Sequence, residues 1–155
     1  MRRSDREVAD FREILDILRR ADTIHLGLRG EEYPYVVPLS FGFEVADGKI
    51  VIYFHGAQEG LKHELLAANS AVCVEASLFH GYREVPGSVT AEYEAVIGFG
   101  QAGRVTGSEA ARGLDLLLEH CGYAGFAYDL AALEMTAVYK ITLTRWSGKR
   151  QFVRK

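Results

Sequence analysis

Strand-like segments follow one another along most of this chain, with turns rather than regularly spaced helices between them. Apolar alternation and clusters of β-branched and aromatic residues predict about six strands, over 23–28, 33–45, 49–54, 71–79, 89–106 (bent or jointed at its glycines) and 136–146. Asp47-Gly48, between two of these segments, is typical of a tight hairpin turn. Since no regular strand–helix alternation is present, the order favours an antiparallel barrel of the α+β class over a doubly wound parallel sheet.

Three amphipathic segments predict helices around this sheet. Ser4-Asp5-Arg6-Glu7 matches a capping box and predicts a first helix that ends near Ala21. A short helix is expected over 58–69, and a third over 109–120 with Ser108 as its cap. Gly81, Pro86 and Gly87 predict a loop over 80–88.

Length and composition predict a single globular domain over residues 1–155 and exclude several classes of function. The chain is 48% hydrophobic and 25% charged, with a net charge of −3, so no strong positive field would draw it to nucleic acid. No apolar run approaches the ~20 residues that span a bilayer, and the polar start does not resemble a signal peptide. Cys73 and Cys121 lie far apart, and the five histidines show no metal-ligand spacing, so no metal is expected. We expect a soluble cytoplasmic protein with reduced thiols.

One motif in the sequence is discounted. Residues 98–103, GFGQAG, match the glycine spacing of a dinucleotide-binding loop. That loop requires a helix directly after it, whereas Arg104-Val105-Thr106-Gly107 predicts a strand and a turn. The glycines are therefore interpreted as bulge or close-packing positions in a barrel strand.

Two segments admit both a structural and a functional interpretation. Pro34 and Pro38 interrupt an otherwise strong strand, which indicates an exposed sheet edge or an edge whose backbone faces a flat ligand. Further on, the strand at 49–54 passes through His55-Gly56-Ala57 into a helix that carries Lys62 in its first turn. Exposed amides at a helix start, with a nearby lysine, are typical of a phosphate site, although an ordinary turn has the same pattern.

Four blocks, taken in order, make the pattern specific. They are YVVPLSFGF (35–43), YFHGA (53–57) with Lys62 and Leu65, YEAVIGFG (93–100) and WSGKR (146–150). Together they resemble the pyridoxamine 5′-phosphate oxidase-like flavoproteins, and within these most closely the nitroimidazole-resistance branch of 5-nitroimidazole reductases. The resemblance covers nearly the whole chain. Ser40 and Leu61 depart from it, since many members carry Asn and a second lysine at these positions.

The resemblance implies a fold, a cofactor and a set of site residues. The fold would be a six-stranded antiparallel split β-barrel with peripheral helices, assembled as a homodimer with FMN between the subunits. The residues that would lie along the isoalloxazine ring are Val37, Pro38, Leu39, Ser40 and Phe41, and those that would hold the ribityl phosphate end are His55, Gly56, Ala57 and Lys62. Those that would line the site are Glu94, Ala95, Val96, Ile97 and Gly98, and Trp146, Lys149 and Arg150 would approach it from the same or the other subunit.

Each later block also has a plain structural interpretation. Val96 and Ile97 fit a core, Trp146 fits the filling of a barrel, and Lys149 with Arg150 fits a solvated tail. The agreement of all four blocks with one family favours the functional interpretation.

The family resemblance implies an FMN-dependent oxidoreductase. NAD(P)H would reduce the flavin, which would pass electrons to a small acceptor such as a nitroaromatic, with His55 in contact with flavin or substrate as proton donor or orienting group. Lys149 or Arg150 would stabilise the reduced flavin. Two alternatives stay open: a non-enzymatic flavin- or haem-binding protein of the same fold, and an interaction protein without cofactor.

Overall fold

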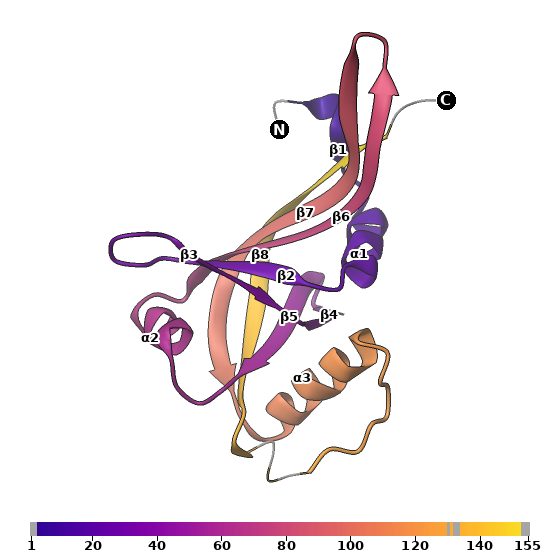
Figure 1. Ribbon diagram of the computed structural model, residues 1–155. Coiled ribbons are helices and arrows are strands. Elements are labelled where there is room, and N and C mark those ends of the chain that lie inside the picture. Colours follow the sequence, from indigo (N-terminus) through magenta and orange to yellow (C-terminus); the bar gives the residue numbers. More distant parts are fainter. Residues whose placement is uncertain (1–2, 130, 132–133, 153–155) are drawn as a thin grey trace.

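Figure 1 shows the computed structural model of the chain, which describes residues 3–129, 131 and 134–152. The helices are the 3-10 turn η1 (Ser4–Arg6), α1 (Phe11–Arg20), α2 (Leu61–Ala68) and α3 (Gly107–His120). The strands are β1 (Glu7–Val8), β2 (Ile24–Leu28), β3 (Tyr35–Leu39), β4 (Gly42–Ala46), β5 (Lys49–Gly56), β6 (Ala71–Val85), β7 (Ser88–Val105) and β8 (Ala137–Gln151).

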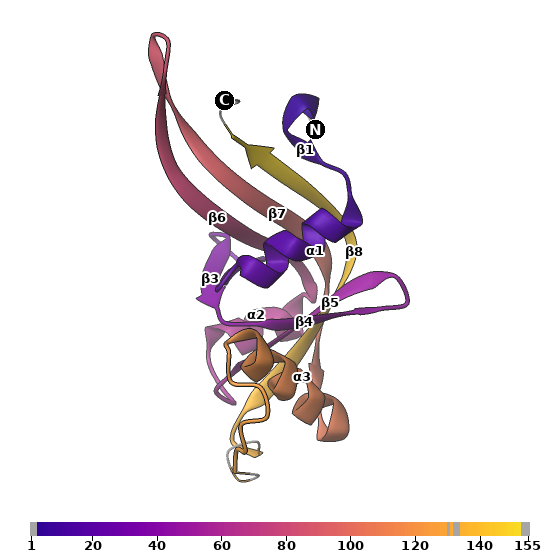
Figure 2. The same ribbon diagram turned by 90° about the vertical axis from the view of Figure 1, so that its right-hand side faces the viewer.

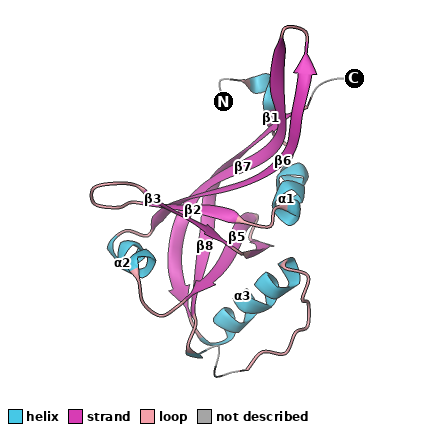
Figure 3. Cartoon of the chain, in the orientation of Figure 1, coloured by secondary structure: helices cyan, strands magenta, loops and turns pink. Residues whose placement is uncertain are grey.

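The eight strands among the described residues belong to one antiparallel sheet in the order β3-β2-β6-β7-β8-β5-β4, with β1 added to β8. The end strands β3 and β4 are consecutive in the chain and are joined only through Ser40 and Phe41. The sheet must therefore curl until its two ends meet, which gives a barrel with helices around it (Figure 3). The predicted antiparallel barrel of the α+β class is confirmed. Its strand count is eight because 33–45 divides into β3 and β4 and because β1 adds a short strand.

The core fills the inside of this barrel. Ile24, Leu26, Ile52, Phe54 and Ile141 are completely shielded from solvent, as the alternation of their strands predicts. On the other face of β5, α3 covers the strand: an added Cβ on Gly113 would lie 2.6 Å from Cδ1 of Tyr53. The interval from Ile50 to Phe54 is thus buried on both faces.

The first helix begins later than the capping box predicts. Asp10, not Ser4, caps α1, and its carboxylate accepts a hydrogen bond from the Arg12 backbone at 2.7 Å. The residues before it are used differently, because Glu7 and Val8 pair with Lys149 and Gly148 and bury Val8. Tertiary strand pairing thus overrides the local helix signal.

The predicted loop at 80–88 is wrong. β6 continues to Val85 and β7 starts at Ser88, so the two strands form a long hairpin that rises away from the barrel (Figure 2). We call the part of it from 79 to 92 the hairpin arm. Gly81 (φ 120°) allows a bulge within the arm, and Gly87 (φ 72°) forms its tight turn.

Three further boundaries differ from the sequence-based expectation. β7 is continuous through Gly98 and Gly100, with one irregularity in its pairing with β8. β8 extends to Gln151 and includes the residues expected in a tail. Thr106, not Ser108, stands at the cap position of α3. Among the described residues, no helix is long and apolar enough to cross a membrane.

Candidate functional site

The corner between β5 and α2 forms the candidate site. β5 ends at Gly56, and α2 starts at Leu61 after a short turn whose Gly60 has φ 127°, a conformation suited to glycine. No side chain caps the first turn of α2. Its first amides are therefore left for water or a ligand.

Lys62 lies directly against the end of β5. A Cβ added to Gly56 would be 2.7 Å from the Lys62 ammonium, so the lysine lies in the space that the glycine leaves open. The same ammonium lies 5.4 Å from the centre of the Phe54 ring. Predicted residues His55, Gly56, Ala57 and Lys62 are thus brought together at one corner.

Two more basic side chains reach this corner. His63 follows Lys62 on α2, and its Nδ1 is 2.8 Å from the Tyr139 hydroxyl on β8. Arg104 lies beside Tyr139 in the β7–β8 ladder and donates a hydrogen bond to the Gln58 side chain. Sequence reasoning missed both His63 and Arg104. His63 adjoins the motif lysine, whereas strand register alone brings Arg104 here, so no local signal marks it.

The corner is a site of uncompensated positive charge. Within the described part of the chain, neither Lys62, His63 nor Arg104 forms an ion pair with a carboxylate. Burial lowers the pKa of Lys62. Burial, and then the Lys62 ammonium, lower the pKa values of His55 and His63, with Arg104 adding to the effect at His63. Donors of this kind beside free helix amides fit a phosphate group.

The predicted ring-binding segment enters the same region from β3. Val37 and Leu39 pack against the core, whereas Pro38 faces outward opposite His25. Because Gly42 pairs with Tyr53 in the β4–β5 ladder, the preceding Ser40 and Phe41 approach the end of β5 that carries His55. Phe41 is fully buried and packs on the His120 ring at 4.3 Å, so neither its ring nor its backbone is open to a ligand, whereas Ser40 before it is exposed.

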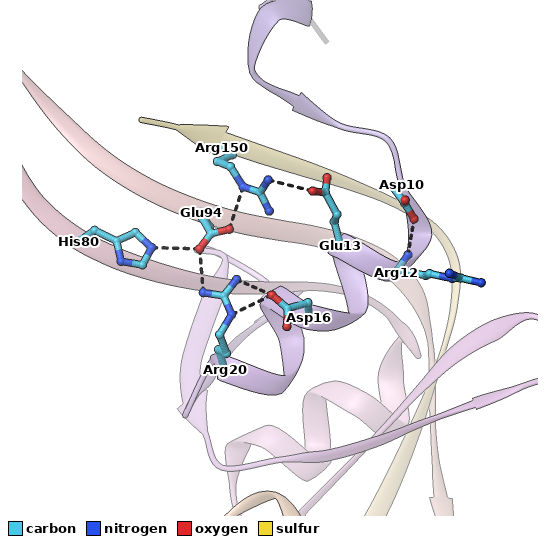
Figure 4. Close-up of polar contacts among 8 residues, drawn as sticks. All are labelled: Asp10, Arg12, Glu13, Asp16, Arg20, His80, Glu94 and Arg150. Atoms are coloured by element: carbon cyan, nitrogen blue, oxygen red, sulfur yellow. Dashed lines mark hydrogen bonds and ion pairs between the residues drawn. The ribbon is translucent and has the colours of Figure 1, made fainter. Parts of the chain in front are cut away.

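Glu94 and Arg150 belong to a separate buried network (Figure 4). The carboxylate of Glu94 accepts hydrogen bonds from Arg20 at 2.7 Å and Arg150 at 2.8 Å, and it lies 3.0 Å from the His80 ring. Burial alone would raise the pKa of Glu94, but these three partners outweigh it and hold the value at about 2. All of its partners lie within the chain, so the network joins α1 to β6, β7 and β8.

The remaining predicted residues also lie along the long strands. Trp146 packs on Phe11 of α1 at 5.5 Å between ring centres, and Val96 is in the core. A Cβ on Gly98 would meet Leu143 at 2.5 Å, which supports the close-packing interpretation of this glycine. Ala95, Ile97 and Lys149 share the outer face of the sheet.

These residues are remote from the β5–α2 corner within one chain. The ladders place His55 beside Val138, and Val138 beside Val105 of β7. At about 3.3 Å per residue, Gly98 lies roughly 23 Å and Glu94 roughly 36 Å from Val105 along that strand. The chain therefore brings the end of β3, the end of β5 and the start of α2 together, and it keeps the predicted β7 and β8 residues apart from the β5–α2 corner. No group of three or more metal-ligating side chains occurs among the residues that the structure describes.

The curled antiparallel sheet defines a split-barrel protein, and the basic corner between β5 and α2 is its candidate site. The sequence matches the profile of the pyridoxamine 5′-phosphate oxidase family over residues 10–150, and the chain belongs to this family. No curated protein matches the sequence.

Several solved structures share the fold. A protein from Bacteroides thetaiotaomicron assigned to 5-nitroimidazole antibiotic resistance is 30% identical, with a TM-score of 0.82 over 92% of this chain and 85% of its own. An FAD- and haem-binding protein from Mycobacterium smegmatis is 20% identical, with a TM-score of 0.81 over 96% and 74%. An FAD-binding protein from Mesorhizobium loti is 18% identical, with a TM-score of 0.69 over 95% and 98%.

Proposed function

We propose that the protein is a flavin-dependent oxidoreductase that holds FMN with its phosphate at the β5–α2 corner. The observation that carries the proposal is the group of basic side chains without carboxylate partners beside the uncapped start of α2. The family membership and the flavin-binding proteins of the same fold support it. The 30% identity to the Bacteroides thetaiotaomicron protein supports placement in the nitroimidazole-resistance branch, with a nitroaromatic as acceptor.

The chain's own residues have distinct tasks in this proposal. Lys62 and the first amides of α2 bind the phosphate, and Gly56 leaves the space for the lysine. The β3 backbone from Val37 to Leu39, with Ser40, lies along the ring. When bound, the flavin supplies two-electron transfer between NAD(P)H and the acceptor. His55, which is solvent-accessible at the end of β5, orients the acceptor or gives it a proton.

A homodimer completes the proposal. Adjacent strands align Val36 with Phe99, and Pro38 with Ile97, across the outer face of β3, β2, β6 and β7. Val36 is 59% exposed, and Ile97 and Phe99 are about two-fifths exposed (40% and 38%). We call these four residues the outer apolar face. Contact through this face would let a second copy bring Lys149, which shares it, near the flavin. Trp146 and Arg150 lie on the opposite face, where they contact Phe11 and Glu94.

Binding of FMN and of riboflavin tests the phosphate assignment directly. Lys62→Met keeps the length of the side chain but removes its charge. We expect it to weaken FMN binding by about tenfold, equivalent to ~1.4 kcal/mol, with riboflavin affinity almost unchanged because riboflavin has no phosphate. Lys49→Met, at the exposed β4–β5 turn, is the matched control. Equal losses for the two ligands would contradict a phosphate contact at Lys62.

The absorption spectrum and the mass of the ligand released by heat test the cofactor itself. Flavin bands with the mass of FMN, and their loss on addition of NAD(P)H, would support the oxidoreductase. An FAD mass would correct the cofactor, and a Soret band would assign the site to haem. A bound flavin that NAD(P)H does not reduce would indicate a flavin-binding protein without turnover. Failure to bind added flavin would overturn the proposal.

A further inference from the structure

His63 is a titratable group at the basic corner that the function proposed above does not use. It lies in the first turn of α2 and is half-buried. Its Cε1 atom is 3.7 Å from the position that a Cβ on Gly56 would occupy, on the side of the strand where the Lys62 ammonium lies. The ring therefore lies at the place where a bound anion would meet Lys62.

Tyr139 fixes the orientation of this histidine. Its ring stacks on Phe54 at 5.2 Å with an interplanar angle of 5°, and β5 and β7 flank it in the sheet. Burial raises the pKa of Tyr139, so its hydroxyl keeps the proton at ordinary pH. A hydroxyl that donates to Nδ1 of neutral His63 leaves the ring proton on Nε2. When His63 is protonated, Nδ1–H donates to the hydroxyl instead, so both forms keep one ring orientation.

The charges around His63 favour its neutral form while the corner holds no anion. β5 contributes His55, α2 contributes Lys62, and β7 contributes Arg104. Burial, Lys62 and Arg104 together lower the pKa of His63. Glu59 and Glu64 are exposed carboxylates close in sequence, and neither is hydrogen-bonded to the ring. A doubly charged anion at the corner would reverse this balance, because it would attract a proton to the ring.

We propose that His63, oriented by Tyr139, is the proton-accepting member of the anion site, so that a phosphate dianion binds between Lys62 and Arg104 together with one proton from solvent. The identity of the ligand as the flavin phosphate rests on the proposed function. The coupling itself rests on the contacts of His63, Tyr139, Lys62 and Arg104, and applies to any phosphate ester dianion.

Histidine NMR titration with inorganic phosphate tests the coupling without flavin. The His63 signal is assigned by its loss in His63→Gln. At matched ionic strength in chloride, we expect phosphate to raise the pKa of His63 by about one unit, a tenfold change in proton affinity. His25, on β2 opposite Glu75, is the internal control and should not shift. An unchanged His63 pKa, or an equal rise at His25, would overturn the proposal.

Calorimetry in buffers of different ionisation enthalpy tests the coupling with flavin. At pH 7.0 we expect uptake of a fraction of a proton when FMN binds and none when riboflavin binds. His63→Gln should lose this uptake and bind FMN about tenfold more weakly, whereas His63→Lys should restore the affinity without uptake, because its charge is permanent. Tyr139→Phe keeps the stack on Phe54 but removes the hydroxyl that contacts His63. It should weaken the binding of FMN and leave the binding of riboflavin unchanged. Uptake that persists in His63→Gln and disappears in His55→Gln would reassign the proton to His55 and overturn the proposal.

The two experiments separate this inference from the proposed function. Phosphate-linked protonation of His63 in a protein that binds no flavin would contradict the flavin proposal and leave the anion site in place. FMN binding without proton uptake, and without a shift of His63, would support the flavin proposal and contradict the role of His63.

Discussion

Glu94 shows how one side chain can connect four elements of the barrel. Its carboxylate is almost completely buried and is held by Arg20 of α1, His80 of β6 and Arg150 of β8. Glu94→Gln would leave two arginines facing a neutral group, and breaking a buried ion pair of this kind costs about 3 kcal/mol. We expect that loss in urea denaturation, with no change in flavin affinity at the distant β5–α2 corner. The exposed Glu84→Gln on the hairpin arm should have almost no effect on stability.

The same carboxylate sets an acid limit to stability. Its pKa is about 2 in the folded chain, below the ordinary value of 4.5. Its stabilising effect is therefore complete above about pH 4.5 and is lost as the pH falls toward 2. The difference in unfolding free energy between the wild type and Glu94→Gln should shrink across that interval. A difference independent of pH would show that the network is not held by the charge of Glu94.

His55 is the residue at which the proposed chemistry is tested. His55→Ala should lower turnover with NAD(P)H and a nitroaromatic by about 10²-fold, the usual range for loss of a proton-transferring group. Its thermal unfolding should stay close to that of the wild type, because the side chain is exposed at the end of β5. His25→Ala, on another strand, is the control. Unchanged rates in His55→Ala would refute its role.

The candidate site was predictable at the residues that are close in sequence and not at those that only the fold brings near. His55, Gly56, Ala57 and Lys62 follow one another through a strand end and a helix start, so the sequence pattern marks them as a unit. Arg104 reaches the same corner only through the register of β7 on β8. Conversely, the family pattern marks Glu94, but it does not indicate the partner of Glu94. In this chain the partner is Arg20, and no spacing in the sequence relates the two residues.

Among the elements, the close contact of α3 with β4 depends on Gly42, which has no side chain. A Cβ at Gly42 would lie 2.3 Å from the backbone nitrogen of Leu117, so any larger residue must push the helix away. Gly42→Ala should destabilise the fold by about 2 kcal/mol, as overpacking does elsewhere. Gly103→Ala is the matched control, since nothing lies within 4 Å of its Cβ position. Denaturation midpoints compare the two, and equal effects would contradict the close approach.

The elements also show where local patterns fail. The sheet was predictable because alternation reports which face of a strand is buried, as at Ile24, Leu26 and Leu28. The start of α1 was not, because the strand pairing of Val8 with Gly148 competes with a local capping signal. The hairpin arm was not predictable either. Gly81, Pro86 and Gly87 are typical of a loop, and here they form a bulge and a tight turn within a continuous ladder.

At the scale of the whole molecule, the outer apolar face is the feature that a single chain leaves unexplained. Val36 and Pro38 of β3 share rows of the sheet with Phe99 and Ile97 of β7, and the other face of this sheet is the core. Gly27 and Cys73 lie between Val36 and Phe99, and the His25–Glu75 pair lies between Pro38 and Ile97. A stable interface buries about 800 Å² of each partner, and apolar side chains on one regular surface suit that purpose. We therefore expect the protein to sediment at twice its 17.2 kDa chain mass.

Phe99→Glu places a charge on this face and should produce a monomer in sedimentation at micromolar concentration, because the contact would then bury a charge. Phe126→Glu, at an exposed aromatic residue (58%) beyond α3, should remain dimeric.

If the cofactor lies between the subunits, the Phe99→Glu monomer should also bind FMN more weakly although Lys62 and His63 are intact. A monomer that binds FMN with unchanged affinity would show that the β5–α2 corner is sufficient by itself, and a wild type that sediments as a monomer would remove the second copy from the site.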